Sequence, residues 1–177
     1  MACSLSTIDP GKCDVTPMFY RALSVKQPFA SLIGAGAKTI ETRSYLTKYR
    51  GRLLICASAK VHNGNFLVLE NDQLFDDNCQ QFVKQNKSEY PLGVMICTVN
   101  LVDCRPMIQE DCARAWCKWY SGAYSWILED VQPVLQIPVK GQLGIFKIES
   151  NLIQSQNGKR LKFFKKLNII FSFHFHL

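Results

Sequence analysis

The sequence predicts an α+β fold, in which a small, partly open β-barrel carries two or three helices on its outside. Three observations lead to this prediction. A length of 177 residues suits a single domain. Short apolar or alternating runs, typical of strands, dominate residues 20–150 and are separated by glycine and proline turns. Three segments instead show helical spacing or helix-end signals, and they lie between the predicted strands.

The first predicted elements are a strand over residues 22–25 and a short helix over 28–33. Pro28 suits the first turn of this helix, because an N–H is not needed there. Gly34 or Gly36 then ends the helix. The next run, 39–45, alternates and predicts a strand. On that strand one face carries Thr39, Glu41 and Arg43, and the other carries Ile40 and Thr42.

The middle of the chain predicts a buried strand over 51–57, an amphipathic helix over 66–85 and a strand over 92–102. In the strand over 92–102 the inward positions are expected to be Val94, Ile96 and Val102. A helix is predicted over 109–119, with acidic residues near its start. The last elements are a strand over 124–128, an edge or irregular extended segment over 131–139 with two prolines, and a final strand over 143–148.

The two ends of the chain differ from residues 20–150, which we interpret as the domain. Residues 1–19 form an irregular lead-in. Residues 151–177 are basic and rich in phenylalanine, and they supply five of the excess positive charges, so that 16 basic and 14 acidic residues remain in 1–150. This tail is interpreted either as a basic amphipathic element that contacts nucleic acid or membrane, or as an extension with little role.

The composition indicates a cytoplasmic protein without a membrane span, a metal or a cofactor. No run reaches the roughly 18–20 apolar residues of a transmembrane helix. The N-terminus lacks the pattern of a secretory signal, so the eight cysteines are expected to be free thiols. The pair Cys112 and Cys117 has no histidine nearby, and His174 and His176 stand almost at the chain end.

The strongest candidate site consists of Lys38, Glu41 and Arg43, three charges beside a glycine break between a helix and a strand. We expect them to line a cleft, with Lys38 and Arg43 meeting phosphate or base acceptors and Glu41 meeting base donors. An ion pair between Glu41 and Arg43 is expected as well. Two neighbouring cations favour the ionised carboxylate, which argues for a positioning role of Glu41 over proton abstraction.

Further candidates flank these charges, each with a structural alternative. Ser24 and Gln27 either place polar groups in the cleft or cap the helix. Trp126 either stacks on a base or packs in the core. We interpret Trp116, Trp119 and Tyr120 as packing residues of a helix. The basic residues Lys48, Arg50 and Arg52 form either a positive rim of the cleft or a solvated loop.

The segments Leu23-Ser24-x-x-Gln27-Pro28-Phe29-Ala30 and Gly36-x-Lys38-x-x-Glu41-x-Arg43 resemble the signature of the ASCH domain, a family related to the PUA-like β-barrel fold. Residues 124–129 and 138–141 also resemble the last strands of its small stand-alone members. The resemblance covers roughly residues 20–148 and implies a barrel whose cleft is lined by the signature residues.

The resemblance implies a protein that binds RNA, a nucleotide or a nucleoside. Alternatively, it implies a hydrolase: some members are ribonucleases, and one branch resembles acetylcytidine amidohydrolases that use a lysine, a threonine and a glutamate. Lys38 matches that lysine, but Glu41 occupies the threonine position. An enzyme would therefore use Lys38 and Glu41. A protein-interaction module with an unknown protein partner is the third alternative.

Overall fold

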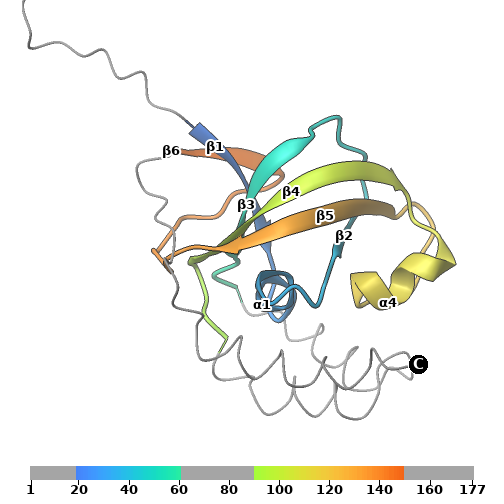
Figure 1. Ribbon diagram of the computed structural model, residues 1–177, viewed down its shortest axis with the longest axis horizontal. Helices are drawn as coiled ribbons and strands as arrows, with labels where there is room; N and C mark the ends of the chain where they lie inside the picture. The colour runs from blue at the N-terminus through green and yellow to red at the C-terminus, as the bar shows by residue number, and fades with distance from the viewer. Residues whose placement is uncertain (1–18, 61–89, 150–177) are drawn as a thin grey trace, which may run out of the picture.

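The computed structural model describes residues 19–60 and 90–149, and these form one mixed six-stranded sheet with the strand order β2-β5-β4-β3-β1-β6 (Figure 1). The strands are β1 (Phe19–Val25), β2 (Ile40–Arg43), β3 (Gly51–Ala57), β4 (Met95–Pro106), β5 (Tyr124–Pro133) and β6 (Ile145–Glu149). Only the pair β1 and β3 is parallel; the other neighbours run antiparallel. The sheet curls but stays open, with β2 and β6 at its edges, so the predicted α+β fold with a partly open barrel is confirmed.

Both faces of the central strands are buried, which explains the dense apolar run of β3. Leu53 and Ile55 pack on one face with α1 (Phe29–Gly34), in the largest core cluster. Leu54 and Cys56 pack on the other face against β6. Since side chains alternate along a strand, covering both faces requires apolar residues at consecutive positions.

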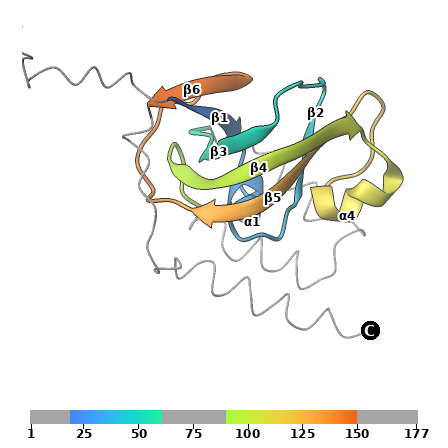
Figure 2. The same ribbon diagram turned by 45° about the horizontal axis from the view of Figure 1, so that its top comes forward.

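Helix α1 crosses the inner face of the sheet and ends where the sequence predicts (Figure 2). Gly36 adopts a left-handed conformation with φ of 79°, and the amides of Ala37 and Lys38 both donate to the carbonyl of Leu32. This glycine turn redirects the chain from α1 into β2, and it fixes the backbone of Lys38 against the end of the helix.

The connection between β4 and β5 carries a 3₁₀ turn (Gln109–Asp111) and the short helix α4 (Cys112–Ala115). The predicted helix over 109–119 is therefore too long. It stops because Trp116 adopts a left-handed conformation, with φ of 53°, and reverses the chain. Arg114 and Thr39 hold this turn against β2: the amide of Thr39 donates to the carbonyl of Arg114 at 3.2 Å.

Other strand predictions need adjustment. β4 starts and ends later than the predicted strand over 92–102, and β5 continues beyond residue 128. Val102 was expected to face inward but is exposed, because an irregularity in the pairing of β3 with β4 between Ile55 and Cys56 shifts the alternation. After it, Cys97, Val99 and Leu101 face the core. Phe19 belongs to β1 and not to the lead-in.

Several predictions concern residues outside the described ranges. The helix over 66–85, most of the lead-in and the tail over 151–177 fall there. Within residues 19–60 and 90–149, no helix has both the length and the apolar character that crossing a bilayer requires.

Candidate functional site

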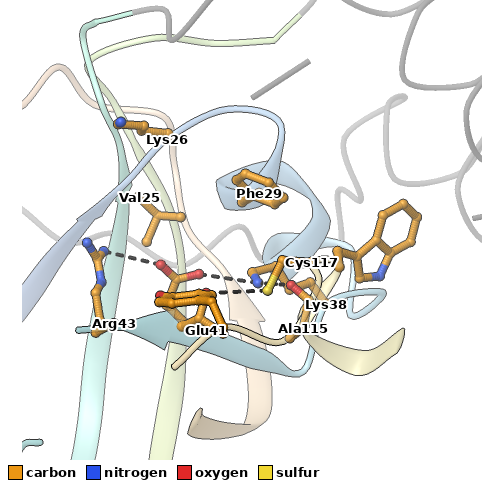
Figure 3. Close-up of a pocket in the computed structure, with 11 residues that line it drawn as sticks. Val25, Lys26, Phe29, Lys38, Glu41, Arg43, Ala115 and Cys117 are labelled. Carbon is orange, nitrogen blue, oxygen red and sulfur yellow. Dashed lines mark hydrogen bonds and ion pairs between the residues drawn. The ribbon is translucent and has the colours of Figure 1, made fainter. Parts of the chain in front are cut away.

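A pocket of about 360 Å³ opens between α1, the edge strand β2 and the segment that follows α4 (Figure 3). Its lining combines three cationic side chains, one carboxylate, three aromatic rings and a thiol. The lining residues are Val25, Lys26, Phe29, Lys38, Glu41, Thr42, Arg43, Ala115, Trp116, Cys117 and Tyr120. The predicted triad of Lys38, Glu41 and Arg43 therefore lies in a concave, solvent-reachable site.

Lys38 is a buried lysine, with only 2 % of its surface exposed. Its ammonium donates to the carbonyl of Ala115 and lies 5.1 Å from the centre of the Phe29 ring. The Ala115 carbonyl is one of the last of α4, and such carbonyls have no partner within their own helix. The left-handed turn at Trp116 thus presents this carbonyl to Lys38.

Glu41 lies between the two cations and contacts both. One carboxylate oxygen lies 3.4 Å from the Lys38 Nζ atom, and the other lies 3.3 Å from Nη2 of Arg43. Its side chain is 9 % exposed. The expected ion pair between Glu41 and Arg43 is confirmed. Both contacts are longer than the 2.7–2.9 Å typical of charge-assisted hydrogen bonds.

Arg43 forms the outer edge of the cluster, with 26 % of its side chain exposed. Its Nη2 atom donates to the backbone carbonyl of Ser24 at 2.8 Å, which ties β2 to the end of β1. The Nε atom of Arg43 is buried and has no hydrogen-bond partner among the described residues. The hydrogen-bonding capacity of the guanidinium is therefore not filled by the described residues.

Burial lowers the pKa of Lys38 below its ordinary value, because an ammonium loses hydration there. The negative charge of Glu41 opposes this shift. Burial also raises the pKa of the Cys117 thiol, and the nearby Lys38 opposes that second shift. Cys117 lies 3.7 Å from the hydroxyl of Thr42, measured between Sγ and Oγ1. The pocket thus disfavours an isolated charge, and the pairing of Lys38 with Glu41 opposes this effect.

Residues 23–138, about two thirds of the chain, match the family model of the ASCH domain. The chain belongs to the ASCH domain family. The match includes every lining residue of the pocket, from Val25 to Tyr120. The resemblance of the signature residues to this family is thereby confirmed.

Curated relatives of this ASCH domain are much longer proteins. The chain is 31 % identical over 136 residues to activating signal cointegrator 1 of Homo sapiens, and 30 % identical over 137 residues to the same protein of Mus musculus. Each alignment covers 75 % of this chain but 23 % of the relative. Among solved structures, an ASCH protein from Zymomonas mobilis is 14 % identical, with a TM-score of 0.49; the alignment covers 75 % of this chain and 89 % of that one.

Two of the other predicted site residues have structural contacts outside the pocket lining. Gln27 donates to the carbonyl of Pro91 at 2.8 Å and accepts from the amide of Ser31 at 3.1 Å, so it caps α1, as the structural alternative stated. Ser24 contributes its carbonyl to Arg43, while its hydroxyl is buried without a partner among the described residues.

Trp126 is in the core of the ASCH domain and not in the pocket. Its side chain is 0 % exposed, its Nε1 atom donates to the carbonyl of Tyr45 at 3.3 Å, and its ring meets that of Tyr45 edge to face. The prediction that Trp126 stacks on a base is therefore wrong. The strand assignment was right, but β5 lies beside both β2 and β4, and its inner face is covered.

Several pocket residues were not among the site residues predicted from the sequence. Tyr120, interpreted as packing, is 44 % exposed and lines the pocket, as do Phe29 and Cys117. Thr42, assigned to the opposite face of its strand, lines it too, next to Cys117. Of these, Phe29 had a signal, because it lies within the Gln-Pro-aromatic element of the family signature.

The pocket owes its positive character to few residues. Arg50 and Arg52, which were possible parts of a positive rim, pair with Asp103 at 3.1 Å and with Asp130 at 2.6 Å. Both therefore lie in local ion pairs away from the pocket lining. Within residues 19–60 and 90–149, no group of three histidine, cysteine or acidic side chains is arranged to hold a metal ion.

Proposed function

We propose that this ASCH domain binds RNA and holds one nucleotide unit in the pocket beside Lys38, Glu41 and Arg43. The observation that supports the proposal is the convergence of three cationic side chains and one carboxylate in one concave site with aromatic walls. A volume of about 360 Å³ lies at the lower end of the range for small-molecule pockets, as a nucleotide unit requires.

The residues divide into three roles in this proposal. Lys26 and Arg43 face the sugar-phosphate backbone, since Lys26 is exposed at the rim and Arg43 is partly exposed. Glu41 accepts hydrogen bonds from base amino or imino groups. Phe29 and Tyr120 offer ring surfaces to the base. Lys38 keeps Glu41 in place through their 3.4 Å contact.

The test is the affinity of the protein for a panel of short single-stranded RNAs, measured by fluorescence anisotropy. Arg43→Gln and Glu41→Gln are expected to weaken binding by roughly tenfold or more, since a lost base or charged contact costs about 1–3 kcal/mol. Arg52→Gln is the matched control, because it removes one arginine from one ion pair outside the pocket.

The proposal is contradicted if all three variants bind RNA with the affinity of the wild-type protein. Equal losses for Arg43→Gln and Arg52→Gln, together with tighter binding by Glu41→Gln, would contradict it as well, because they would indicate a response to net charge alone. Unfolding curves for each variant identify any loss of affinity that comes from loss of the fold.

Hydrolysis of RNA or of a modified nucleoside is the second candidate. The observation that favours it is the lowered pKa of Lys38, which increases the neutral, proton-accepting fraction of its amine. Incubation with labelled RNA and with acetylcytidine tests this candidate, with Lys38→Met as the control protein. Turnover that Lys38→Met abolishes supports the candidate, and binding without turnover of either substrate counts against it.

A further inference from the structure

Glu41 holds two hydrogen-bond acceptors side by side at the pocket, with a cation beyond each. Its Oε2 atom lies 3.4 Å from the Lys38 ammonium, and its Oε1 atom lies 3.3 Å from Nη2 of Arg43. Figure 3 shows the carboxylate between the two cations, and all three side chains line the pocket. An ionised carboxylate has about four lone-pair sites, and the ion pairs among the described residues use one site on each oxygen.

The row from Lys38 to Arg43 therefore offers a donor, two acceptors and a donor. The Lys38 ammonium carries three N–H donors, and its contacts within residues 19–60 and 90–149 are the Ala115 carbonyl and Glu41. A ligand that complements Lys38 and Glu41 together needs one acceptor next to two adjacent N–H donors, all on one edge of the ligand. This requirement is narrow enough to distinguish between classes of ligand.

Two chemical groups present parallel N–H donors to a carboxylate: a guanidinium and the pairing edge of guanine. The pocket lining holds Lys26, Lys38 and Arg43 against one carboxylate, so it repels a further cation and disfavours a guanidinium. Guanine is neutral, and its O6 acceptor stands next to its N1–H and N2 amino donors. Adenine and cytosine instead present one amino donor beside acceptors, and uracil presents one imino donor between two acceptors. Guanine alone among the four bases matches the row.

We propose that the pocket selects guanine, with N1–H donating to Oε2 of Glu41, the N2 amino group donating to Oε1, and O6 accepting from Lys38. This inference rests on the proposed binding of RNA and deepens it. In this orientation the sugar leaves the base on the N2 side, towards Arg43. Lys26 belongs to the same side, because it follows Ser24 by two residues and the Ser24 carbonyl accepts from Arg43. The two partly exposed cations thus face the sugar-phosphate backbone, while Glu41 determines the base.

The experiment measures the affinity of the full chain for a short oligouridine whose central position is guanosine, inosine, adenosine, cytidine or uridine. Inosine is the decisive probe, because it keeps O6 and N1–H and lacks only the 2-amino group. The wild-type protein is expected to bind the guanosine RNA about tenfold more tightly than the inosine RNA, as one lost hydrogen bond to a charged acceptor predicts. The other three RNAs should bind at least as weakly as the inosine RNA.

Glu41→Gln is expected to reduce the preference for guanosine to within about twofold, because an amide replaces one of the two acceptors by a donor. Glu129→Gln is the matched control, since Glu129 is an exposed glutamate of β5 outside the pocket lining and its substitution changes the net charge equally. The readout is the ratio of affinities for two RNAs of equal charge, so a general change in electrostatic attraction cancels.

Equal affinity of the wild type for the guanosine and inosine RNAs would overturn the inference, and this comparison needs no variant to fold. A guanosine preference that persists in Glu41→Gln would overturn it too. If all the RNAs bind equally while Arg43→Gln weakens each of them, guanine selection is wrong but RNA binding in the pocket stands. If none of the RNAs binds, the proposed function and guanine selection are both wrong.

Discussion

The structure contains two carboxylates that are buried beside arginines, and they are held in different ways. Asp111 accepts from both terminal nitrogens of Arg105 at 2.7 Å, from the hydroxyl of Ser125 at 2.7 Å and from the amide of Ile108 at 3.2 Å. Glu41 has two contacts, at 3.3 and 3.4 Å. The first group is saturated with short hydrogen bonds, whereas the second is loosely paired and lies in a pocket.

This difference separates a structural cluster from a candidate binding cluster. The network of Asp111 holds the start of the α4 connection against β5, and through α4 it places the Ala115 carbonyl beside Lys38. Both carboxylate oxygens of Asp111 already accept hydrogen bonds from the protein. Within the described part of the chain, the Glu41 cluster keeps an unpartnered Nε atom on Arg43, and each Glu41 oxygen has one contact longer than 3 Å. Incomplete pairing of buried polar groups is costly, and it is typical of functional sites.

The largest effect is expected from Asp111→Ala. We expect it to lower the free energy of unfolding by about 3 kcal/mol, because it leaves Arg105, Ser125 and an amide without their acceptor. Urea denaturation followed by tryptophan fluorescence measures the loss. The control is Asp103→Ala, whose carboxylate is 52 % exposed and pairs with Arg50, for which about 0–1 kcal/mol is expected. Equal losses in the two variants would remove the distinction between the clusters.

A smaller loss in the free energy of unfolding is expected at acidic pH. Hydrogen bonds from Arg105 lower the pKa of Asp111 from 3.8 to about 2. Because the pKa is lowered in the folded state, the stabilisation is present above pH 3.8 and is lost as the pH falls towards 2. That stabilisation is about 2 kcal/mol. Urea denaturation at pH 6 and pH 3 measures this loss. The free energy of unfolding of the wild type should be closer to that of Asp111→Asn at pH 3 than at pH 6. A difference that stays constant would contradict the lowered pKa of Asp111.

The smallest effect concerns the two serines of the clusters. Ser125→Ala is expected to cost about 1–2 kcal/mol, because it removes a buried donor to Asp111. Ser24→Ala removes a buried hydroxyl without a partner among the described residues, so we expect no loss of stability. Thermal unfolding of both variants provides the measurement. A cost for Ser24→Ala that matches Ser125→Ala would show that the Ser24 hydroxyl is already bonded in the free protein.

The sequence predicted the charged centre of the site because that centre is local. Lys38, Glu41 and Arg43 lie within six residues, and the helix, the glycine turn and the short strand that orient them follow from local patterns. Alternation placed Glu41 and Arg43 on one face, and their ion pair follows from it. The fold class was predictable for the same reason, since strand patterns of period two are visible along the chain.

The rest of the pocket depends on contacts distant in the sequence. Cys117 and Tyr120 reach the pocket only because the chain reverses at Trp116, and a tryptophan gives no signal for a left-handed residue. The strand pattern around Trp126 is the same whether its ring lies at the pocket or in the core. Only the position of β5 between β2 and β4 decides that the ring is buried. The irregularity in the pairing of β3 with β4 that exposes Val102 has no marker such as glycine.

The strand that carries Glu41 and Arg43 has consequences through its place in the sheet. Strand β2 spans four residues, stands at the edge and pairs with β5 alone among the described strands. Edge strands open locally at lower free energy than central ones such as β4. Its amides should therefore exchange with deuterium sooner than those of β4, and ligand binding should slow that exchange. The recognition residues would then belong to an edge of the sheet that opens more readily than its centre, which couples affinity to local order.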